Sequence, residues 1–181
     1  MTDDVTIREA RLDDAAIIAQ FNCALSRETE DGELDLETVT RGVSRFLQGA
    51  AAGFYSVAEI DGRVVGCLMI THEWTDWRDG NLWWIQSVYV HPEARRRGVF
   101  RALFDGVRSR AEADRDVRGI RLYVERDNDR ARCTYESFGM TEKPYRIYEL
   151  LVDGDGADLT GDIDPWPALA NHLTPSTSSP R

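Results

Sequence analysis

The stretch from Leu82 to Ala113 constrains the possible folds more than any other part of the sequence. Leu82–Val90 is an apolar run that predicts a strand, and the strand must stop by Pro92 because proline cannot donate to a strand ladder. After a basic turn the pattern changes, and Gly98–Ala113 carries apolar residues at helical spacing. A buried strand followed directly by an amphipathic helix predicts a domain in which helices pack on a sheet.

The rest of the chain continues this alternation of strand and helix patterns. Further strands are expected at Val5–Arg11, Phe54–Ile60, Val64–Ile70, Ile120–Glu125 and Tyr145–Val152. Further helices are expected after a cap at Asp13 or Asp14, around Val39–Leu47, and at Asn128–Phe138 before Gly139. The connections include an acidic loop at Ser26–Asp35 and a hairpin turn at Asp61-Gly62. This order predicts an α/β (or α+β) protein with a mixed sheet and helices on its faces.

Length and composition favour one domain followed by a tail. The chain has 181 residues, of which 42% are apolar, and this is enough for one domain with a proper core. We expect that domain to occupy residues 1–152. Residues 153–181 are acidic and rich in proline and serine, so we expect a flexible tail with Trp166 as its candidate anchor.

Charge and cysteine usage exclude several classes of protein. A net charge of -10 argues against nucleic acid or an anionic membrane as the main partner. Met1–Asp4 is polar, and no apolar run approaches the length of a membrane span. Cys23, Cys67 and Cys133 lie far apart, which favours reduced thiols over a disulfide framework or a zinc site. We therefore expect a cytoplasmic protein without a metal site.

The basic turn between the strand and the helix suits an anion. The first N–H groups of a helix have no acceptor within the helix, and the positive end of its dipole favours negative charge. Gly98 lets the backbone approach a pyrophosphate closely, and Arg95–Arg97 add charged donors. Two other interpretations stay open for the turn alone: a solvated arginine cluster, and a nucleic-acid patch that the acidic composition weakens.

Two segments resemble motifs of the GNAT superfamily of N-acetyltransferases. Arg95–Phe100 is similar to its acetyl-CoA motif, (Arg/Gln)-x-x-Gly-x-(Gly/Ala), although Phe100 stands where Gly or Ala is usual. Asn128–Met140 resembles the pattern Asn-x-x-Ala-x-x-x-Tyr-x-x-x-Gly-(Phe/Met) at every marked position. The resemblance runs from about Val5 to Leu151. It implies a GNAT-like acyl-CoA N-acyltransferase fold with a mixed, mostly antiparallel central sheet flanked by helices.

The same resemblance implies an activity and a set of site residues. The activity is transfer of an acetyl group from acetyl-CoA to a primary amine by direct attack, with Tyr135 protonating the departing thiolate. The implied cofactor-binding residues are Val88, Tyr89 and Val90 for the pantetheine, Arg95, Arg96, Arg97, Gly98, Val99 and Phe100 for the pyrophosphate, and Asn128 for the cofactor arm. Two alternatives stay open: Tyr135 as a core aromatic, and an acyl-CoA-binding sensor or interaction module that has lost turnover.

The general base and the acceptor amine are less constrained. Some members of the superfamily carry a glutamate where this sequence has Tyr123, so the candidates are Glu125, Glu33, Glu73, His72 or a water. The acidic loop and four tryptophans favour a cationic acceptor, with a covered sheet face or a homodimer contact as the alternative for Trp74, Trp77, Trp83 and Trp84. Cys133 is expected to be a small buried residue and not a nucleophile.

Overall fold

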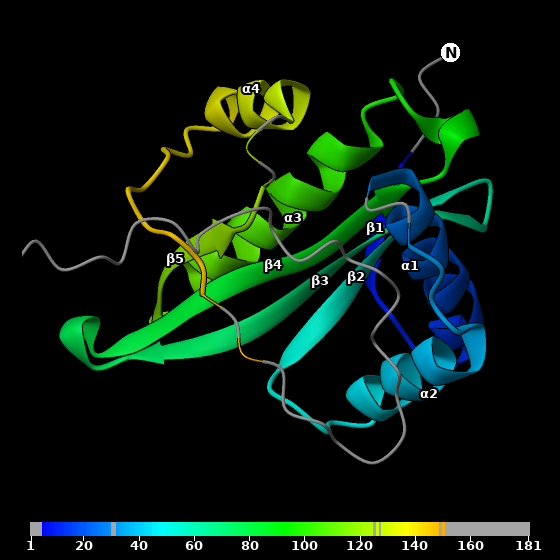
Figure 1. Ribbon diagram of the computed structural model, residues 1–181, viewed down its shortest axis with the longest axis horizontal. Helices are drawn as coiled ribbons and strands as arrows, with labels where there is room; N and C mark the ends of the chain where they lie inside the picture. The colour runs from blue at the N-terminus through cyan, green and yellow to red at the C-terminus, as the bar shows by residue number, and fades with distance from the viewer. Residues whose placement is uncertain (1–4, 30–31, 125, 127, 149, 151–181) are drawn as a thin grey trace, which may run out of the picture. The chain divides into compact units, whose positions relative to one another are not determined.

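The computed structural model of this chain describes residues 5–29, 32–124, 126, 128–148 and 150. Its helices and strands lie in one compact unit that ends at Tyr145. A five-stranded sheet in the order β1-β2-β3-β4-β5 forms the centre of this unit (Figure 1). The strands are β1 (Thr6–Glu9), β2 (Gly53–Ile60), β3 (Arg63–Thr75), β4 (Gly80–Val90) and β5 (Val117–Leu122). Only β4 and β5 pair in parallel, so the predicted mixed, mostly antiparallel sheet is confirmed.

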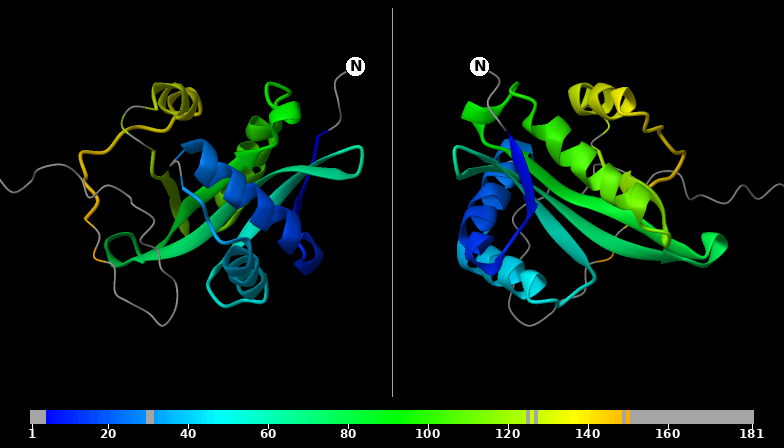
Figure 2. Two further views of the ribbon diagram at one scale, coloured as in Figure 1. Left: turned by 45° about the vertical axis from the view of Figure 1, so that its right-hand side comes forward. Right: turned by 180° about the vertical axis from the view of Figure 1, so that it is seen from behind.

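Helices cover both faces of the sheet. α1 (Ala15–Thr29) and α2 (Leu36–Leu47) lie on one face, and α3 (Val99–Ala113) lies on the other (Figure 2). Successive residues of a strand point to opposite faces, so β2 buries Tyr55 against α1 and α2 and Phe54 against α3. α4 (Asp129–Ser137) follows β5, and Phe138 at its end contacts Phe104 of α3 with 4.5 Å between the ring centroids.

Two local features prepare the site. The turn at Asp61-Gly62 has φ values of 51° and 72°, as a two-residue hairpin turn requires, so that prediction is confirmed. In β4 the register with β3 shifts: Ser87 pairs with Met69 and Ile85 pairs with Ile70, which leaves Gln86 as the extra residue of a β-bulge. The bulge re-aims the strand just before the segment in which the sequence predicts the pantetheine contacts.

Several predicted boundaries are wrong, each for a local reason. α1 continues through Ser26 to Thr29, because no glycine or proline interrupts it there, and a short 3₁₀ turn at Leu12–Asp14 precedes it. β3 extends to Thr75 because its last residues pair with the start of β4. β5 covers Val117–Leu122 instead of Ile120–Glu125, because its pairing with β4 starts and ends earlier.

The predicted last strand is also wrong for the residues that the structure describes. Tyr145–Tyr148 and Leu150 adopt no strand, while the remainder of Tyr145–Val152 lies outside the described residues. Residues 153–181, including Trp166, lie outside them as well, so the flexible tail stays a prediction.

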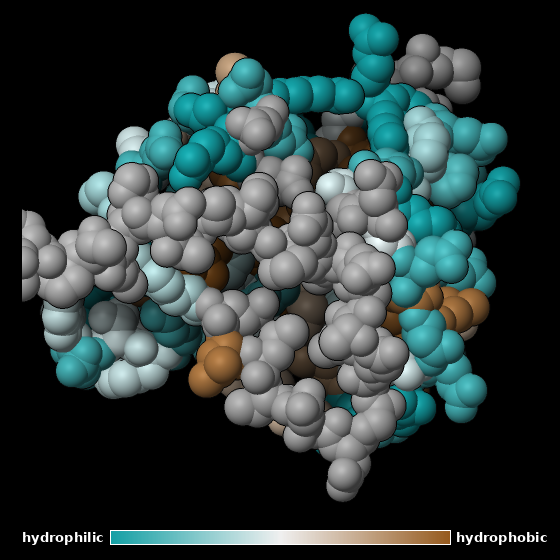
Figure 3. All heavy atoms as spheres, in the orientation of Figure 1, coloured by the Kyte–Doolittle hydropathy of each residue, from teal (hydrophilic) through white to brown (hydrophobic). Residues whose placement is uncertain are grey.

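Hydrophilic side chains surround α4 and the α1–α2 layer on the face drawn in Figure 3. Within the described ranges, no helix is long and apolar enough to cross a membrane.

Candidate active site

A cleft opens where β4 and β5 separate. The last paired residues of these strands are Ile85 and Leu122, and beyond them lies a cavity of about 240 Å³. Three residues predicted as site residues line it: Val88 from β4, Asn128 at the start of α4, and Tyr135 within α4. The structure therefore brings together residues that lie up to 47 positions apart in the sequence.

The main chain of β4 has open positions beside this cleft. The N–H of His91 donates to the carbonyl of Val65 on β3 at 2.8 Å, which fixes the phase of the antiparallel hydrogen-bond pattern. Hydrogen-bonded and non-bonded positions alternate along an antiparallel strand. The main-chain groups of Tyr89 therefore face β3, while those of Val88 and Val90 point away from β3. They point to the side that β5 no longer reaches.

The basic turn has the backbone geometry of an anion site. Arg96 and Gly98 both have positive φ, 66° and 81°, and Gly98 is the N-cap of α3. The first hydrogen bond of this helix runs from the N–H of Ala102 to the carbonyl of Gly98 at 3.0 Å. The N–H groups of Val99 and Phe100 precede that bond, so they have no acceptor within the helix. Both residues belong to the segment in which the sequence predicts a pyrophosphate site.

The side chain of Phe100 packs into an aromatic cluster between α3 and α4. Its ring lies 6.2 Å from that of Phe104, 5.6 Å from that of Phe138 and 5.9 Å from that of Tyr135, measured between centroids. The departure from Gly or Ala at this position of the motif thus supplies packing for α4. Phe100 also contacts the one aromatic residue predicted to act in catalysis.

Tyr135 and Asn128 are held at the cleft by α4. The side-chain oxygen of Asn128 accepts the N–H of Ala131 at 3.0 Å and caps the helix, which therefore begins at Asp129, one residue later than predicted. Gly139, with a φ of 85°, follows the helix end. Burial raises the pKa of the Tyr135 phenol above its ordinary value of 10.0, so the hydroxyl is protonated at neutral pH and is able to donate a proton.

Sequence reasoning missed the contribution of α1. Leu25 and Thr29 of its last two turns line the cleft, and Glu28 accepts hydrogen bonds from Tyr89 and Arg95. The acidic loop predicted at Ser26–Asp35 would place Glu28 among free carboxylates, whereas the structure places it on α1. The uninterrupted helix-forming sequence up to Thr29 was the signal that would have placed it on α1.

The candidate bases lie in different environments. His72 stacks on Trp83 with 5.4 Å between the ring centroids, on the α3 side of the sheet, and burial lowers its pKa below 6.5. Glu73 accepts the indole N–H of Trp84 and lies 3.6 Å from Arg121. Glu33 is exposed in the connection between α1 and α2, and Glu125 lies outside the described residues.

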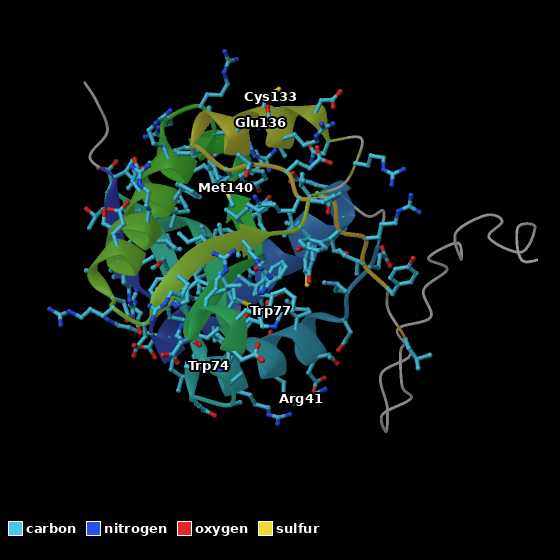
Figure 4. The ribbon with its side chains drawn as sticks, turned by 90° about the vertical axis from the view of Figure 1, so that its left-hand side faces the viewer. Arg41, Trp74, Trp77, Cys133, Glu136 and Met140 are labelled. Carbon is cyan, nitrogen blue, oxygen red and sulfur yellow. The ribbon has the colours of Figure 1, made fainter. Side chains whose placement is uncertain are left out.

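The four tryptophans do not form one cluster. Trp83 is buried in the core against Phe54, while its neighbour Trp84 packs against Tyr123 at the cleft, with 4.4 Å between centroids. Trp74 and Trp77 are exposed near the tip of the β3–β4 hairpin (Figure 4). Strand alternation sends Trp83 and Trp84 to opposite faces, so only Trp84 lies beside residues of the cleft.

The expectation that Cys133 is buried is wrong. Its side chain is exposed on the outer side of α4, whereas Cys23 and Cys67 are buried (Figure 4). The apolar face of α4 is formed by Ala131, Tyr135 and Phe138, and Cys133 lies between these positions on the opposite side of the helix. The cleft-lining residues therefore do not include this thiol.

Comparison with known proteins identifies the family. Residues 19–140 match the acetyltransferase (GNAT) family. The chain is 31% identical over 150 residues to a mycothiol acetyltransferase of Tsukamurella paurometabola, an alignment that covers 77% of this chain but only 49% of that protein. The chain thus spans about half the length of this curated relative.

Solved structures agree with the sequence match. A possible acetyltransferase from Clostridium difficile 630 is 46% identical with a TM-score of 0.78, over 83% of this chain and 99% of that one. A ribosomal-protein-alanine N-acetyltransferase from Brucella melitensis biovar Abortus 2308 shares the fold, with 21% identity and a TM-score of 0.67, over 83% of this chain and 100% of that one. The resemblance inferred from the two motifs is confirmed, and the chain belongs to the acetyltransferase (GNAT) family.

Proposed function

We propose that this acetyltransferase moves an acetyl group from acetyl-CoA to a primary amine, by direct attack of the amine on the bound thioester. The observation that carries the proposal is the shared cleft: Val88, Asn128 and Tyr135 all line the opening between β4 and β5. An opening beside unpaired main chain suits a slender, amide-containing arm, and a protonated phenol on its wall suits a thiolate leaving group.

The cofactor lies along three parts of the chain in this proposal. Its pyrophosphate binds the turn Arg95–Phe100, where helix-start N–H groups and positive charge meet. Its pantetheine follows β4 along Val88, Tyr89 and Val90, with the main-chain groups of Val88 and the N–H of Val90 facing it, since the carbonyl of Val90 accepts the Nε–H of Arg95. The amide of Asn128 binds the arm from the opposite wall of the cleft.

The reaction needs one proton delivered to the departing sulfur and one proton removed from the attacking nitrogen. The amine nitrogen attacks the thioester carbonyl carbon, a C–N bond forms, and the C–S bond breaks. Tyr135 gives its proton to the departing sulfur, and the nitrogen releases a proton to water or to a base. Deprotonating the amine before attack costs about 1 kcal/mol at pH 7 for an α-amino group and about 4.6 kcal/mol for a lysine-like one.

We further propose that the acceptor is cationic before it reacts. The net charge of -10 favours a positively charged substrate over an anionic one. Exposed Glu33, in the connection after α1, is the carboxylate that we assign to attracting it. Glu28 is not available for this role while it is bound to Arg95 and Tyr89.

A second candidate function is an acyl-CoA-binding module without turnover. The observation that favours it is Tyr123, which lines the cleft at the position where some members of the superfamily carry a glutamate base. The two candidates predict the same cofactor affinity and differ in thiol release.

One experiment separates them. Calorimetric titration with acetyl-CoA comes first, followed by a coupled free-thiol assay with a panel of amines: N-terminal peptides, lysine peptides, polyamines, aminoglycosides and small metabolites. The enzyme should bind acetyl-CoA and release thiol above the hydrolytic background with at least one amine class, and Tyr135→Phe should reduce that release. Binding without release across the panel would instead favour the binding module, and no binding would refute both.

A further inference from the structure

The carboxylate of Glu28 connects α1 to the start of the pyrophosphate turn. One oxygen accepts the hydroxyl of Tyr89 at 3.0 Å, and the other accepts a guanidinium N–H of Arg95 at 2.6 Å. Arg95 in turn donates its Nε–H to the carbonyl of Val90 at 2.9 Å and lies over the Tyr89 ring, 5.5 Å from its centroid. A single acidic side chain thus holds the first residue of the turn and the end of β4.

The protonation states of these groups suit this arrangement. Burial alone would raise the pKa of Glu28, but the hydrogen bonds from Arg95 and Tyr89 outweigh it and the pKa is lowered. Burial raises the pKa of Tyr89, and its hydrogen bond to Glu28 raises it further. At neutral pH the carboxylate is therefore the acceptor and both partners are donors, so the contact is charge-assisted on the arginine side.

Glu28 also shares a helix face with two residues that line the cleft. Leu25, Glu28 and Thr29 stand at positions i, i+3 and i+4 of α1, so their side chains leave the same face. Leu25 and Thr29 line the cleft, and Glu28 contacts the cofactor side. The ring of Phe21, about one helical turn before Leu25, lies 5.2 Å from that of Tyr89 and packs α1 against β4.

We propose that Glu28 is a positioning residue that couples the two substrates of the reaction. Binding of the pyrophosphate fixes the turn that begins at Arg95, Arg95 holds Glu28, and Glu28 holds the last two turns of α1. We assign Leu25 and Thr29 of these turns to the wall that the acceptor contacts, because they line the cleft from the helix that leads to Glu33. This inference rests on the proposed function, since it takes Arg95–Phe100 as the pyrophosphate site. The coupling is reciprocal, so binding of the acceptor also raises the affinity of the protein for the cofactor.

The test uses a probe that reaches the turn but cannot touch the α1 wall. Adenosine 3′-phosphate 5′-diphosphate carries the nucleotide and pyrophosphate of CoA and lacks the pantetheine arm. Amide hydrogen exchange of the full chain is followed with and without it, in peptides that cover residues 22–29 and 95–104. In the wild type both segments should exchange more slowly, α1 by about fivefold, the lower end of ordinary coupling free energies.

Glu28→Gln keeps the size of the side chain and removes its charge, and should confine the slowing to residues 95–104. Glu112→Gln, at an exposed carboxylate of α3, is the matched control and should behave as the wild type. If Glu28→Gln is poorly folded, Glu28→Ala replaces it, because alanine is a strong helix former. Glu28→Ala should also confine the slower exchange to residues 95–104. With an amine found in the thiol screen, Glu28→Gln should raise the acceptor KM about fivefold at saturating acetyl-CoA with kcat nearly unchanged.

Two results would overturn the coupling alone. In the first, the probe still slows amide exchange in residues 22–29 of the Glu28 variants. In the second, the probe slows exchange in the wild type only in residues 95–104. If neither the probe nor CoA slows exchange in residues 95–104 of the wild type, the pyrophosphate assignment itself fails and the coupling fails with it.

Discussion

Gly98→Ala provides a direct test of the pyrophosphate turn. Gly98 has a φ of 81°, and a Cβ placed there meets no atom within 4 Å, so the substitution causes no clash and only strains the backbone. A left-handed conformation costs an L-residue about 1–2 kcal/mol. If the free Gly98→Ala turn relaxes out of this conformation and cofactor binding requires it, about 1.4 kcal/mol of that strain raises the Kd for acetyl-CoA about tenfold.

Gly49→Ala is the matched control. Gly49 has a φ of 89° and equally open surroundings, but it follows the end of α2, away from the turn. Its strain should lower the Tm by about 2–4 °C per kcal/mol and leave the Kd unchanged. Calorimetric titration and thermal unfolding of both variants supply the numbers. A folded Gly98→Ala protein with wild-type affinity, or an equal loss of affinity in Gly49→Ala, would refute the assignment.

Three further predictions concern catalysis, stability and thiol reactivity. Tyr135→Phe should lower kcat by about 10²-fold with little change in the Kd for acetyl-CoA, measured by thiol release and calorimetry; full turnover would make Tyr135 a packing residue. Asp14→Asn should cost about 3 kcal/mol in denaturant unfolding at pH 7, because Asp14 accepts two guanidinium N–H groups of Arg8, whereas exposed Asp105→Asn should cost under about 0.5 kcal/mol. The hydrogen bonds from Arg8 hold the Asp14 pKa below its ordinary 3.8, so this stability is complete above pH 3.8 and is lost as the pH falls through the folded value. A disulfide-exchange reagent should titrate one fast thiol, absent in Cys133→Ser, since Cys23 and Cys67 are buried and burial raises the pKa of Cys67 to about 12; two or three fast thiols would contradict the described burial.

The helices that frame the cofactor site were predictable because glycine marks their ends. Gly98 and Gly139 both adopt positive φ, at the start of α3 and the end of α4, and few other residues do so without strain. The end of α1 was predicted wrongly for the opposite reason. Its polar, acidic sequence resembles a loop in composition, but it contains no residue that stops a helix before Thr29.

The site itself was predictable only where a local motif exists. The turn at Arg95–Phe100 and the helix with Tyr135 each carry their residues within a short segment, so sequence spacing was enough to propose them as candidate site residues. Glu28 contacts Tyr89 and Arg95 across 61 and 67 residues of chain, a separation at which no periodicity operates. Such contacts depend on how α1 lies on the sheet, which only the folded structure gives.

The separation of β4 from β5 has a consequence for solubility. An unpaired strand edge normally attracts the strands of other molecules and promotes aggregation. Here the open main chain of Val88 faces inward, in a gap bordered by Leu122 of β5, Thr29 of α1 and Tyr135 of α4, while the carbonyl of Val90 accepts the Nε–H of Arg95. A second polypeptide strand with its side chains is too wide for a cavity of about 240 Å³, but a thin, unbranched ligand is not. With the pantetheine placed as proposed, this strand edge stays accessible to a thin ligand and closed to the strands of other molecules.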